Sequence, residues 1–339
     1  MPALRFSTND LPVAVRREVA EAAYSAHLSG AIDFPAEHPL TADLVLRPVA
    51  DIQMAAIEIS PVRFLTPHGD GDLLYLGMTL TGGGRLSEAG KEPLAAKAGD
   101  ICAMRGELEY DCRAELPSRF LNFSIPYARV LPRVAGGHDG IRLSVAGDSP
   151  PAALLRSYAG AVVTQEGRFS PDEEVIVADH IADLVALVFG ASRDGAERAR
   201  TGGVRAARRL AIERDVRANL GNPALSLSWV ARRHGVSVSY VRSLFYAAET
   251  SFTDFVTAAR LDRVAAALRD PANAHQTVAV LALTSGFGDI SWFNQLFRRR
   301  FGMTPSDMRA SAIWVASSPP ETVPKAPSEQ AHRSLGADG

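Results

Sequence analysis

Two stretches in the last third of the chain follow the same pattern, and this repeat limits the fold more than any other feature. The copies are Leu227–Ala231, Gly235-Val236 and Ser237–Phe245, then Val278–Ala282, Gly286-Phe287 and Asp289–Phe297. Glycine in a left-handed conformation ends many helices, and serine or aspartate at an N-cap begins the next one. Each copy therefore predicts a short helix, a glycine turn and a second helix, which is the helix-turn-helix arrangement.

The second helix of each copy has an apolar and a polar face at helical spacing. The expected core residues are Val238, Val241, Leu244 and Phe245 in the first copy, and Ile290, Phe293, Leu296 and Phe297 in the second. The polar faces consist of Ser239, Arg242, Ser243 and Tyr246, and of Ser291, Asn294, Gln295 and Arg298. Guanidinium and amide groups fit base edges in the major groove of double-stranded DNA. Arg299 and Arg300 suit phosphate or an acidic neighbour.

A helix is predicted between the copies, from Ser251 to Arg269, because Asp270-Pro271 ends the pattern. At roughly 1.5 Å per residue it spans about 28 Å, against about 34 Å between successive major grooves on one side of DNA. A spacer of this length suits two helices in adjacent grooves. An ordinary helical bundle with polar outer faces is the alternative, and the presence of two matching copies favours DNA binding.

The charge is divided unevenly along the chain, although the formal net charge is only -2. The segment 204–310 contains 15 arginines and 8 acidic residues, a net +7, and the remainder carries 21 basic and 30 acidic residues, a net −9. Such asymmetry indicates a polyanionic partner for the basic segment. The sequence shows neither a long apolar run nor a signal-peptide core, so no membrane contact and a cytoplasmic location are expected.

Residues from about 204 to 310 resemble the DNA-binding domain of the AraC/XylS family of bacterial transcription regulators. The resemblance rests on Arg260-Leu261, Gly286-Phe287, Trp292-Phe293, Phe297-Arg298, Phe301–Pro305 and Arg309. It implies that Ser239, Arg242 and Ser243 contact one half-site and that Ser291, Asn294 and Gln295 contact the other. Two positions depart from the family pattern: Tyr246 replaces a basic residue, and Thr250 replaces a glycine at the turn into the spacer helix.

The resemblance also implies a fold class, an α+β multidomain chain with a cupin-like antiparallel β-barrel before the all-α domain. Short strand-like runs within 40–130 and helical patterns at Pro150–Glu166 and Pro171–Phe189 agree with this layout. Val175, Ile176, Ile181, Leu184, Val185 and Val188 form an apolar stripe that packs on its own domain or between subunits. The sequence predicts a sensing and dimerisation domain at 1–190 and a flexible linker at 191–203. A DNA-binding domain is expected at 204–312, with helix-turn-helix motifs at about 227–246 and 278–298. A disordered tail is expected at 313–339.

Catalysis is not expected, and neither is a cofactor or a bound metal. His27, His38, His68, His138 and His180 are far apart in sequence, and His68 is the best isolated candidate for a metal ligand. The Thr81–Arg85 stretch, TGGGR, suits a hairpin turn better than a phosphate-binding loop. Cys102 and Cys112 are expected to be small buried side chains, and Tyr75, Met78 and Met104 to be core residues or pocket lining.

The sequence therefore predicts a DNA-binding transcription regulator that acts as a homodimer and responds to a small molecule, with RNA polymerase as a further candidate partner. The family resemblance suggests an aromatic or other small organic acid, or a related catabolic substrate, and Arg47 or Arg63 could pair with its carboxylate. The ligand-binding residues are otherwise unassigned. Two alternatives remain, an architectural DNA-binding protein without sequence preference and a cupin metalloenzyme fused to a DNA-binding domain.

Overall fold

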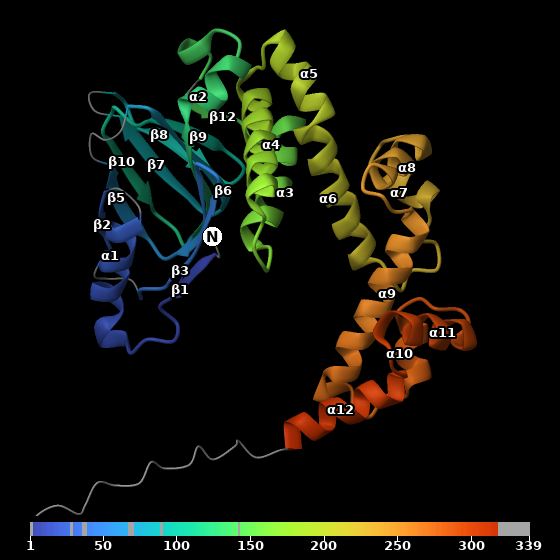
Figure 1. Ribbon diagram of the computed structural model, residues 1–339. Helices are drawn as coiled ribbons and strands as arrows, with labels where there is room; N and C mark the ends of the chain where they lie inside the picture. Colours follow the sequence, from blue (N-terminus) through green and yellow to red (C-terminus); the bar gives the residue numbers. More distant parts are fainter. Residues whose placement is uncertain are drawn as a thin grey trace, which may run out of the picture. The chain divides into compact units, whose positions relative to one another are not determined.

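The computed structural model describes residues 3–27, 30–35, 39–66, 71–88, 91–141 and 143–317 (Figure 1). The chain divides into two compact units. Unit 1 contains Met1–Asp215 and Val230–Ala248, and unit 2 contains Val216–Trp229 and Glu249–Gly339. The first helix-turn-helix is therefore divided between the units, and its second helix belongs to the N-terminal unit. The predicted domain boundary at 191–203 differs from this division.

Unit 1 contains two antiparallel sheets, which together give the cupin-like fold expected from the sequence. The seven-stranded sheet has the order β1-β3-β4-β11-β6-β9-β12. Its strands are β1 (Leu4–Ser7), β3 (Ala42–Val49), β4 (Ile52–Ile59), β6 (Leu73–Thr81), β9 (Ile101–Arg105), β11 (Ser118–Pro126) and β12 (Ser144–Val145). The five-stranded sheet has the order β2-β5-β10-β7-β8. Its strands are β2 (Ala31–Asp33), β5 (Val62–Thr66), β7 (Gly83–Glu88), β8 (Leu94–Lys97) and β10 (Tyr110–Ala114).

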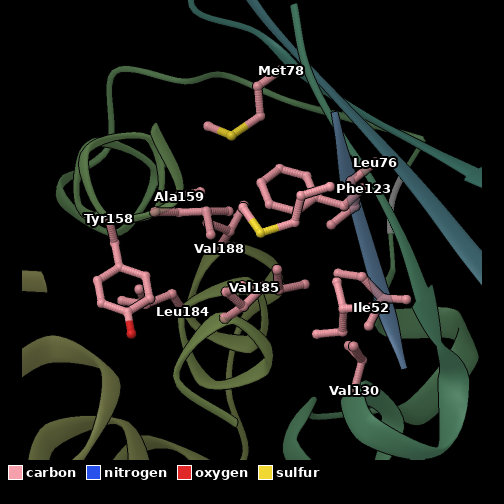
Figure 2. Close-up of a cluster of buried hydrophobic side chains, with 14 of the residues drawn as sticks. Ile52, Leu76, Met78, Phe123, Val130, Tyr158, Ala159, Leu184, Val185 and Val188 are labelled. Atoms are coloured by element: carbon pink, nitrogen blue, oxygen red, sulfur yellow. The ribbon is translucent and has the colours of Figure 1, made fainter. Parts of the chain in front are cut away.

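Apolar residues cover both faces of the seven-stranded sheet, because one face packs on helices and the other on the second sheet. Ile52 of β4 packs toward the helices α3 (Pro150–Thr164) and α4 (Pro171–Phe189). Figure 2 shows this core, in which Leu76 and Phe123 of the sheet meet Ala159, Leu184 and Val185 of the helices. Ile57 and Ile59 on the other face of β4 pack with residues of β5, β10 and α1 (Arg16–His27). Both faces are thus removed from water, which accounts for the long apolar runs in these strands.

Helices α3 and α4 form where the sequence predicts them, since each begins at a serine N-cap followed by proline. In α4, Ser170 and Glu173 form a capping box. The last four residues of the predicted stripe, Ile181, Leu184, Val185 and Val188, pack in the core of unit 1. Val175 and Ile176 remain exposed in the first turns of α4. The shorter helices of this region are η1 (Val13–Val15), α2 (Tyr127–Val130), η2 (Leu131–Arg133) and η3 (Gly137–Gly140).

Two expectations for unit 1 are wrong. The TGGGR stretch does not form a hairpin, because β6 ends at Thr81, β7 begins at Gly83, and the two strands belong to different sheets. The stretch 191–203 is not a flexible linker, because it contains α5 (Arg193–Thr201), which packs against α4. Ser192 caps α5 by accepting a hydrogen bond from the Gly195 N–H at 3.1 Å, and Ala199 is fully buried. Composition suggested a linker, but one cap and one buried face are sufficient for a helix here.

The remaining helices follow the predicted order. They are α6 (Gly203–Ala218), α7 (Leu227–Arg233), α8 (Val238–Tyr246), α9 (Phe252–Arg269), η4 (Pro271–Asn273), α10 (Val278–Thr284), α11 (Ile290–Phe301) and α12 (Pro305–Ser317). The spacer helix α9 begins after its N-cap Ser251, and the left-handed residue before it is Glu249, with φ 54°, not Thr250. Helix α12 continues to Ser317, so residues 313–317 are not part of a disordered tail. The rest of that predicted tail, 318–339, lies outside the described residues.

Candidate nucleic-acid interface

The second helix-turn-helix is held together by aromatic side chains. Phe293 and Phe297 of α11 are fully buried against residues of α9, α10 and α12. The ring centroids of Phe287 and Phe293 are 5.0 Å apart, and those of Phe293 and Phe297 are 5.5 Å apart. Asp289 caps α11 by accepting a hydrogen bond from the Trp292 N–H at 2.9 Å. These contacts fix which face of α11 turns toward the core.

The opposite face of α11 is polar and open to solvent. All five predicted DNA-contacting residues of this helix are exposed, namely Ser291, Asn294, Gln295, Arg298 and Arg299. Arg300 instead contacts α9, where its guanidinium donates two hydrogen bonds to the Asp262 carboxylate, at 3.0 and 2.9 Å. The sequence suggested phosphate or an acidic neighbour as the partner of Arg299 and Arg300. For Arg300 the partner is the acidic neighbour. All three arginines of the run are exposed, and Arg300 in addition ties α11 to α9.

The family-like sequence around these helices has identifiable structural roles. Arg260 Nε donates a hydrogen bond to the Leu220 carbonyl at 3.0 Å, and Leu261 is buried in the core of unit 2. Thr304 caps α12, since its hydroxyl accepts a hydrogen bond from the Asp307 N–H at 3.2 Å. Hydrogen bonds from the Thr304 hydroxyl and backbone N–H hold the pKa of Asp307 below its usual value. The residues that carry the resemblance thus mainly build the scaffold.

The first helix-turn-helix presents a similar polar face on α8. Val241, Leu244 and Phe245 are buried, and Ser237 caps the helix by accepting from the Tyr240 N–H at 3.1 Å. Of the predicted DNA-contacting residues of this helix, Ser239, Arg242 and Tyr246 are exposed, and Tyr246 is 83% exposed. Ser243 is half-buried, and its hydroxyl donates to the Tyr240 carbonyl at 2.8 Å. Ser243 is therefore less free to bind a base than the other three.

Helix α6 supports α8 through contacts that the sequence did not predict. The guanidinium groups of Arg205 and Arg208 lie over the Tyr240 ring, 5.8 and 5.5 Å from its centroid. Arg205 also donates a hydrogen bond to the Ser243 carbonyl at 3.4 Å. At the other end of α6, Asp215 accepts from Arg233 at 2.8 Å and lies 3.2 Å from His234 Nε2. A sequence indication of α6 is the four-residue spacing of Ile212 and Val216, both buried.

The same helix is anchored in the core of unit 1. Ala207 is fully buried in the cluster formed by the seven-stranded sheet, α3 and α4, and Leu210 packs against that cluster. Arg214 donates a hydrogen bond to the Ser157 hydroxyl of α3 at 3.2 Å. Where α5 meets α6, a Cβ added to Gly203 would clash with the His180 carbonyl of α4, so only glycine permits this close approach. Helix α6 thus packs on the core of unit 1 and also contacts α8 directly.

The two arginines suggested for an acidic effector are both occupied. Arg47 is buried, and its guanidinium donates to backbone carbonyls at the end of α3, including that of Gly167 at 3.2 Å. Arg63 donates two hydrogen bonds to the Asp111 carboxylate, at 3.1 and 2.9 Å. Hydrogen bonds from Arg113 and from Arg63 hold the pKa of Asp111 well below its usual value. Both arginines stabilise the fold, and the structure gives no support to either as a carboxylate-binding residue.

The candidate metal ligands do not converge in the part of the chain that the structure describes. His38 and His68 lie outside the described residues, as does the side chain of His27. His138 packs on the Tyr127 ring with centroids 4.7 Å apart, and His180 Nδ1 lies 2.9 Å from the Tyr158 hydroxyl. Burial lowers the pKa of His180. Among the described residues, no three His, Cys, Asp or Glu side chains are grouped to hold a metal ion.

The described helices also include none with both the length and the apolar character that a bilayer span requires. Met78 is a core residue that faces α3 and α4 (Figure 2). Met104 lies on the other face of the sheet, in a small cluster with Cys102 and Cys112, and Tyr75 is half-buried. The structure thus separates Met78 from the other two suggested pocket residues, because Tyr75 and Met104 are cross-strand partners on β6 and β9.

Two family models match this chain. A model described as an AraC-binding-like domain matches residues 17–189, and a helix-turn-helix domain model matches residues 230–311. The transcriptional activator NphR of Rhodococcus sp is 23% identical over 283 residues, which cover 80% of this chain and 81% of NphR. The transcriptional activator RhrA of Rhizobium meliloti (strain 1021) is 27% identical over 168 residues, which cover 50% of this chain and 52% of RhrA. The match thus spans about half the length of RhrA.

Among solved structures, the AraC-like transcriptional activator CuxR aligns with a TM-score of 0.45 and 17% identity, covering 83% of this chain and 100% of that chain. The family assignment rests on the two domain models instead. The AraC-binding-like model alone matches half of the chain, and the helix-turn-helix model matches the region that contains α8 and α11. The chain belongs to the AraC family of transcription regulators.

Proposed function

We propose that this protein is a sequence-specific DNA-binding regulator of transcription that responds to a small-molecule effector. The observation that carries the proposal is the exposed polar face that recurs on α8 and α11. Each face lies opposite a buried apolar face, and each helix follows a glycine turn at Gly235 or Gly286. Two such helices in one chain suit two segments of major groove.

The exposed residues divide into two roles by their chemistry. Arg242, Asn294 and Gln295 have the groups that hydrogen-bond to guanine or adenine edges. Ser239, Ser243 and Ser291 are proposed to contact bases or nearby phosphates through their hydroxyls. Arg298 and Arg299 at the end of α11 are proposed to bind phosphate, which adds affinity without sequence preference. Tyr246 carries no charge, so α8 is expected to contribute less affinity than α11.

The AraC-binding-like region is the proposed site of the effector, an aromatic or other small organic acid or a related catabolic substrate. Because α6 joins the core of this region to α8, we infer that effector binding acts on α8 through α6 and not through a flexible linker. Exposed Val175 and Ile176 on α4 support a homodimer with this helix at the contact. The names of RhrA and NphR as activators support activation, with RNA polymerase as a further partner.

The proposal is tested by comparing Gln295→Ala with Arg299→Ala in the full-length chain. Loss of the amide should relax specificity at one base pair, by about 1–3 kcal/mol, and leave binding to unrelated DNA unchanged. Loss of the guanidinium should weaken binding to every sequence and lower the slope of log K against log[salt] by about one. Arg269→Ala removes an exposed charge at the end of α9 and serves as the control. Identical effects of the first two substitutions would contradict the assignment of the faces.

The DNA sequence for this experiment comes from selection of genomic fragments by the full-length protein at two salt concentrations. Enrichment of two short sequence blocks about one helical turn apart would support the regulator. Salt-dependent binding without enrichment would favour the architectural protein. No binding at either salt concentration would overturn DNA binding altogether.

A further inference from the structure

Three sulfur-containing side chains meet between the two sheets of unit 1. Cys102 and Met104 are two residues apart on β9, so their side chains leave the strand on the same face. Cys112 lies on β10, in the other sheet (Figure 1). Its Sγ is 3.6 Å from the Met104 Sδ. Cys102, Met104 and Cys112 belong to one small packed cluster, separate from the core that faces α3 and α4.

Apolar side chains pack around this sulfur cluster, defined as Cys102, Met104 and Cys112, and the Ser144 side chain hydrogen-bonds to Cys102. Leu86 and Tyr110 are buried beside it, and Leu108 and Leu143 pack against it. Both cysteines are free thiols. Cys102 is 7% exposed, whereas Cys112 and Met104 are only half-buried, so the cluster is closed on most sides and retains access from solvent.

We propose that Cys102, Met104 and Cys112 form a binding site for Cu(I). Thiolate and thioether sulfur are the ligands that this soft monovalent ion prefers, whereas magnesium, calcium and manganese prefer oxygen. Two sulfurs each about 2.3 Å from one ion at a trigonal angle are about 4 Å apart, close to the 3.6 Å between Cys112 Sγ and Met104 Sδ. The strands therefore already hold two of the ligands at a suitable separation.

The composition of the cluster favours Cu(I) over Zn²⁺. Structural zinc sites need four ligands, and among the described residues no His, Asp or Glu side chain is grouped with the two cysteines as a metal site would require. Asp111 is next to Cys112 in sequence, but its carboxylate is held by Arg63 and Arg113. Three soft ligands in an apolar setting are sufficient for Cu(I) and insufficient for a tetrahedral zinc site.

The test is a Cu(I) titration of the reduced full-length protein without oxygen and without DNA, against the chromogenic chelator bicinchoninate. One ion per chain is expected, with an ultraviolet thiolate-to-copper absorption band. Cys102→Ser and Cys112→Ser should each lower the affinity at least a hundredfold, and Met104→Leu about tenfold. Met78→Leu is the matched control, because it removes a methionine sulfur from the opposite face of the same sheet and should leave Cu(I) binding unchanged.

Several outcomes would overturn the site. These are absence of stoichiometric Cu(I), equal losses for Met104→Leu and Met78→Leu, or Zn²⁺ bound as tightly as Cu(I). If a cysteine variant fails to fold, as judged by circular dichroism, the methionine pair still decides the question. The site goes beyond the proposed function, and since the titration contains no DNA, its failure and a failure of DNA binding are observed separately.

Discussion

At the scale of single residues, the two turn glycines illustrate how equivalent positions differ. Gly235 and Gly286 both have left-handed backbones, with φ of 61° and 98°. A Cβ added to Gly235 would meet nothing within 4 Å, whereas one added to Gly286 would clash with the Leu220 carbonyl and the Arg260 side chain. The first glycine is needed for its backbone conformation alone, and the second also for space.

Gly235→Ala should therefore lower the free energy of unfolding by about 1–2 kcal/mol, the cost of a left-handed alanine. Gly286→Ala should lower it by roughly 2–4 kcal/mol, because the Leu220 carbonyl or Arg260 must also move. Urea denaturation followed by circular dichroism measures both values. Equal losses would show that unit 2 adjusts to the added methyl group without cost.

At the scale of elements, α6 determines how the first helix-turn-helix is held. Its N-terminal half is buried in the core of unit 1 through Ala207, and Arg205 and Arg208 contact Tyr240 of α8. Each cation–π contact at an exposed site contributes about 0.5–1 kcal/mol. A helix held at both ends transmits a displacement better than a flexible linker of the same length.

Tyr240→Ala should lower the stability of α7 and α8 by about 1–2 kcal/mol, since the ring is the shared partner of two guanidinium groups. Tyr246→Ala, six residues further along the same helix, removes an exposed ring and should change stability by less than about 0.5 kcal/mol. Hydrogen exchange of α7 and α8 amides, measured by mass spectrometry, compares the variants. Unchanged protection in Tyr240→Ala would mean that other contacts hold α8 on α6.

At the scale of the whole molecule, the chain has two compact units with separate cores. Leu184 is fully buried in the core of unit 1, and Phe297 is fully buried in that of unit 2. Domains with their own hydrophobic cores commonly unfold as separate cooperative units. The uneven charge along the sequence is a second property at this scale, because the basic segment 204–310 includes parts of both units.

Calorimetry of the full-length protein should therefore show two thermal transitions. Leu184→Ala should lower the midpoint of one, and Phe297→Ala that of the other, each through a loss of about 2–5 kcal/mol from the truncated core. Equal shifts of one common transition by both substitutions would show that the units unfold together.

Local periodicity and caps were sufficient to predict both helix-turn-helix motifs. The exposed and buried faces of α8 and α11 follow from spacing within nine or twelve residues, and Ser237 and Asp289 act as caps as expected. The long strands β3, β4, β6, β9 and β11 were also indicated by their sequence. Helical period and capping depend on residues a few positions apart, so one sequence specifies them without its tertiary contacts.

Tertiary packing alone decided the rest, because the partners are distant in sequence. The run Arg298–Arg300 contains three identical exposed residues, and only the position of Asp262 on α9 shows that Arg300 is the one bound to that carboxylate. The sequence suggested Arg47 as a ligand-binding residue, but its guanidinium donates hydrogen bonds to backbone carbonyls at the end of α3. Helix α5 replaced a predicted linker because α4 supplies the surface that buries Ala199. The sequence by itself determined the two amphipathic helices α8 and α11, and long-range contacts determined that Arg300 is the arginine bound to Asp262.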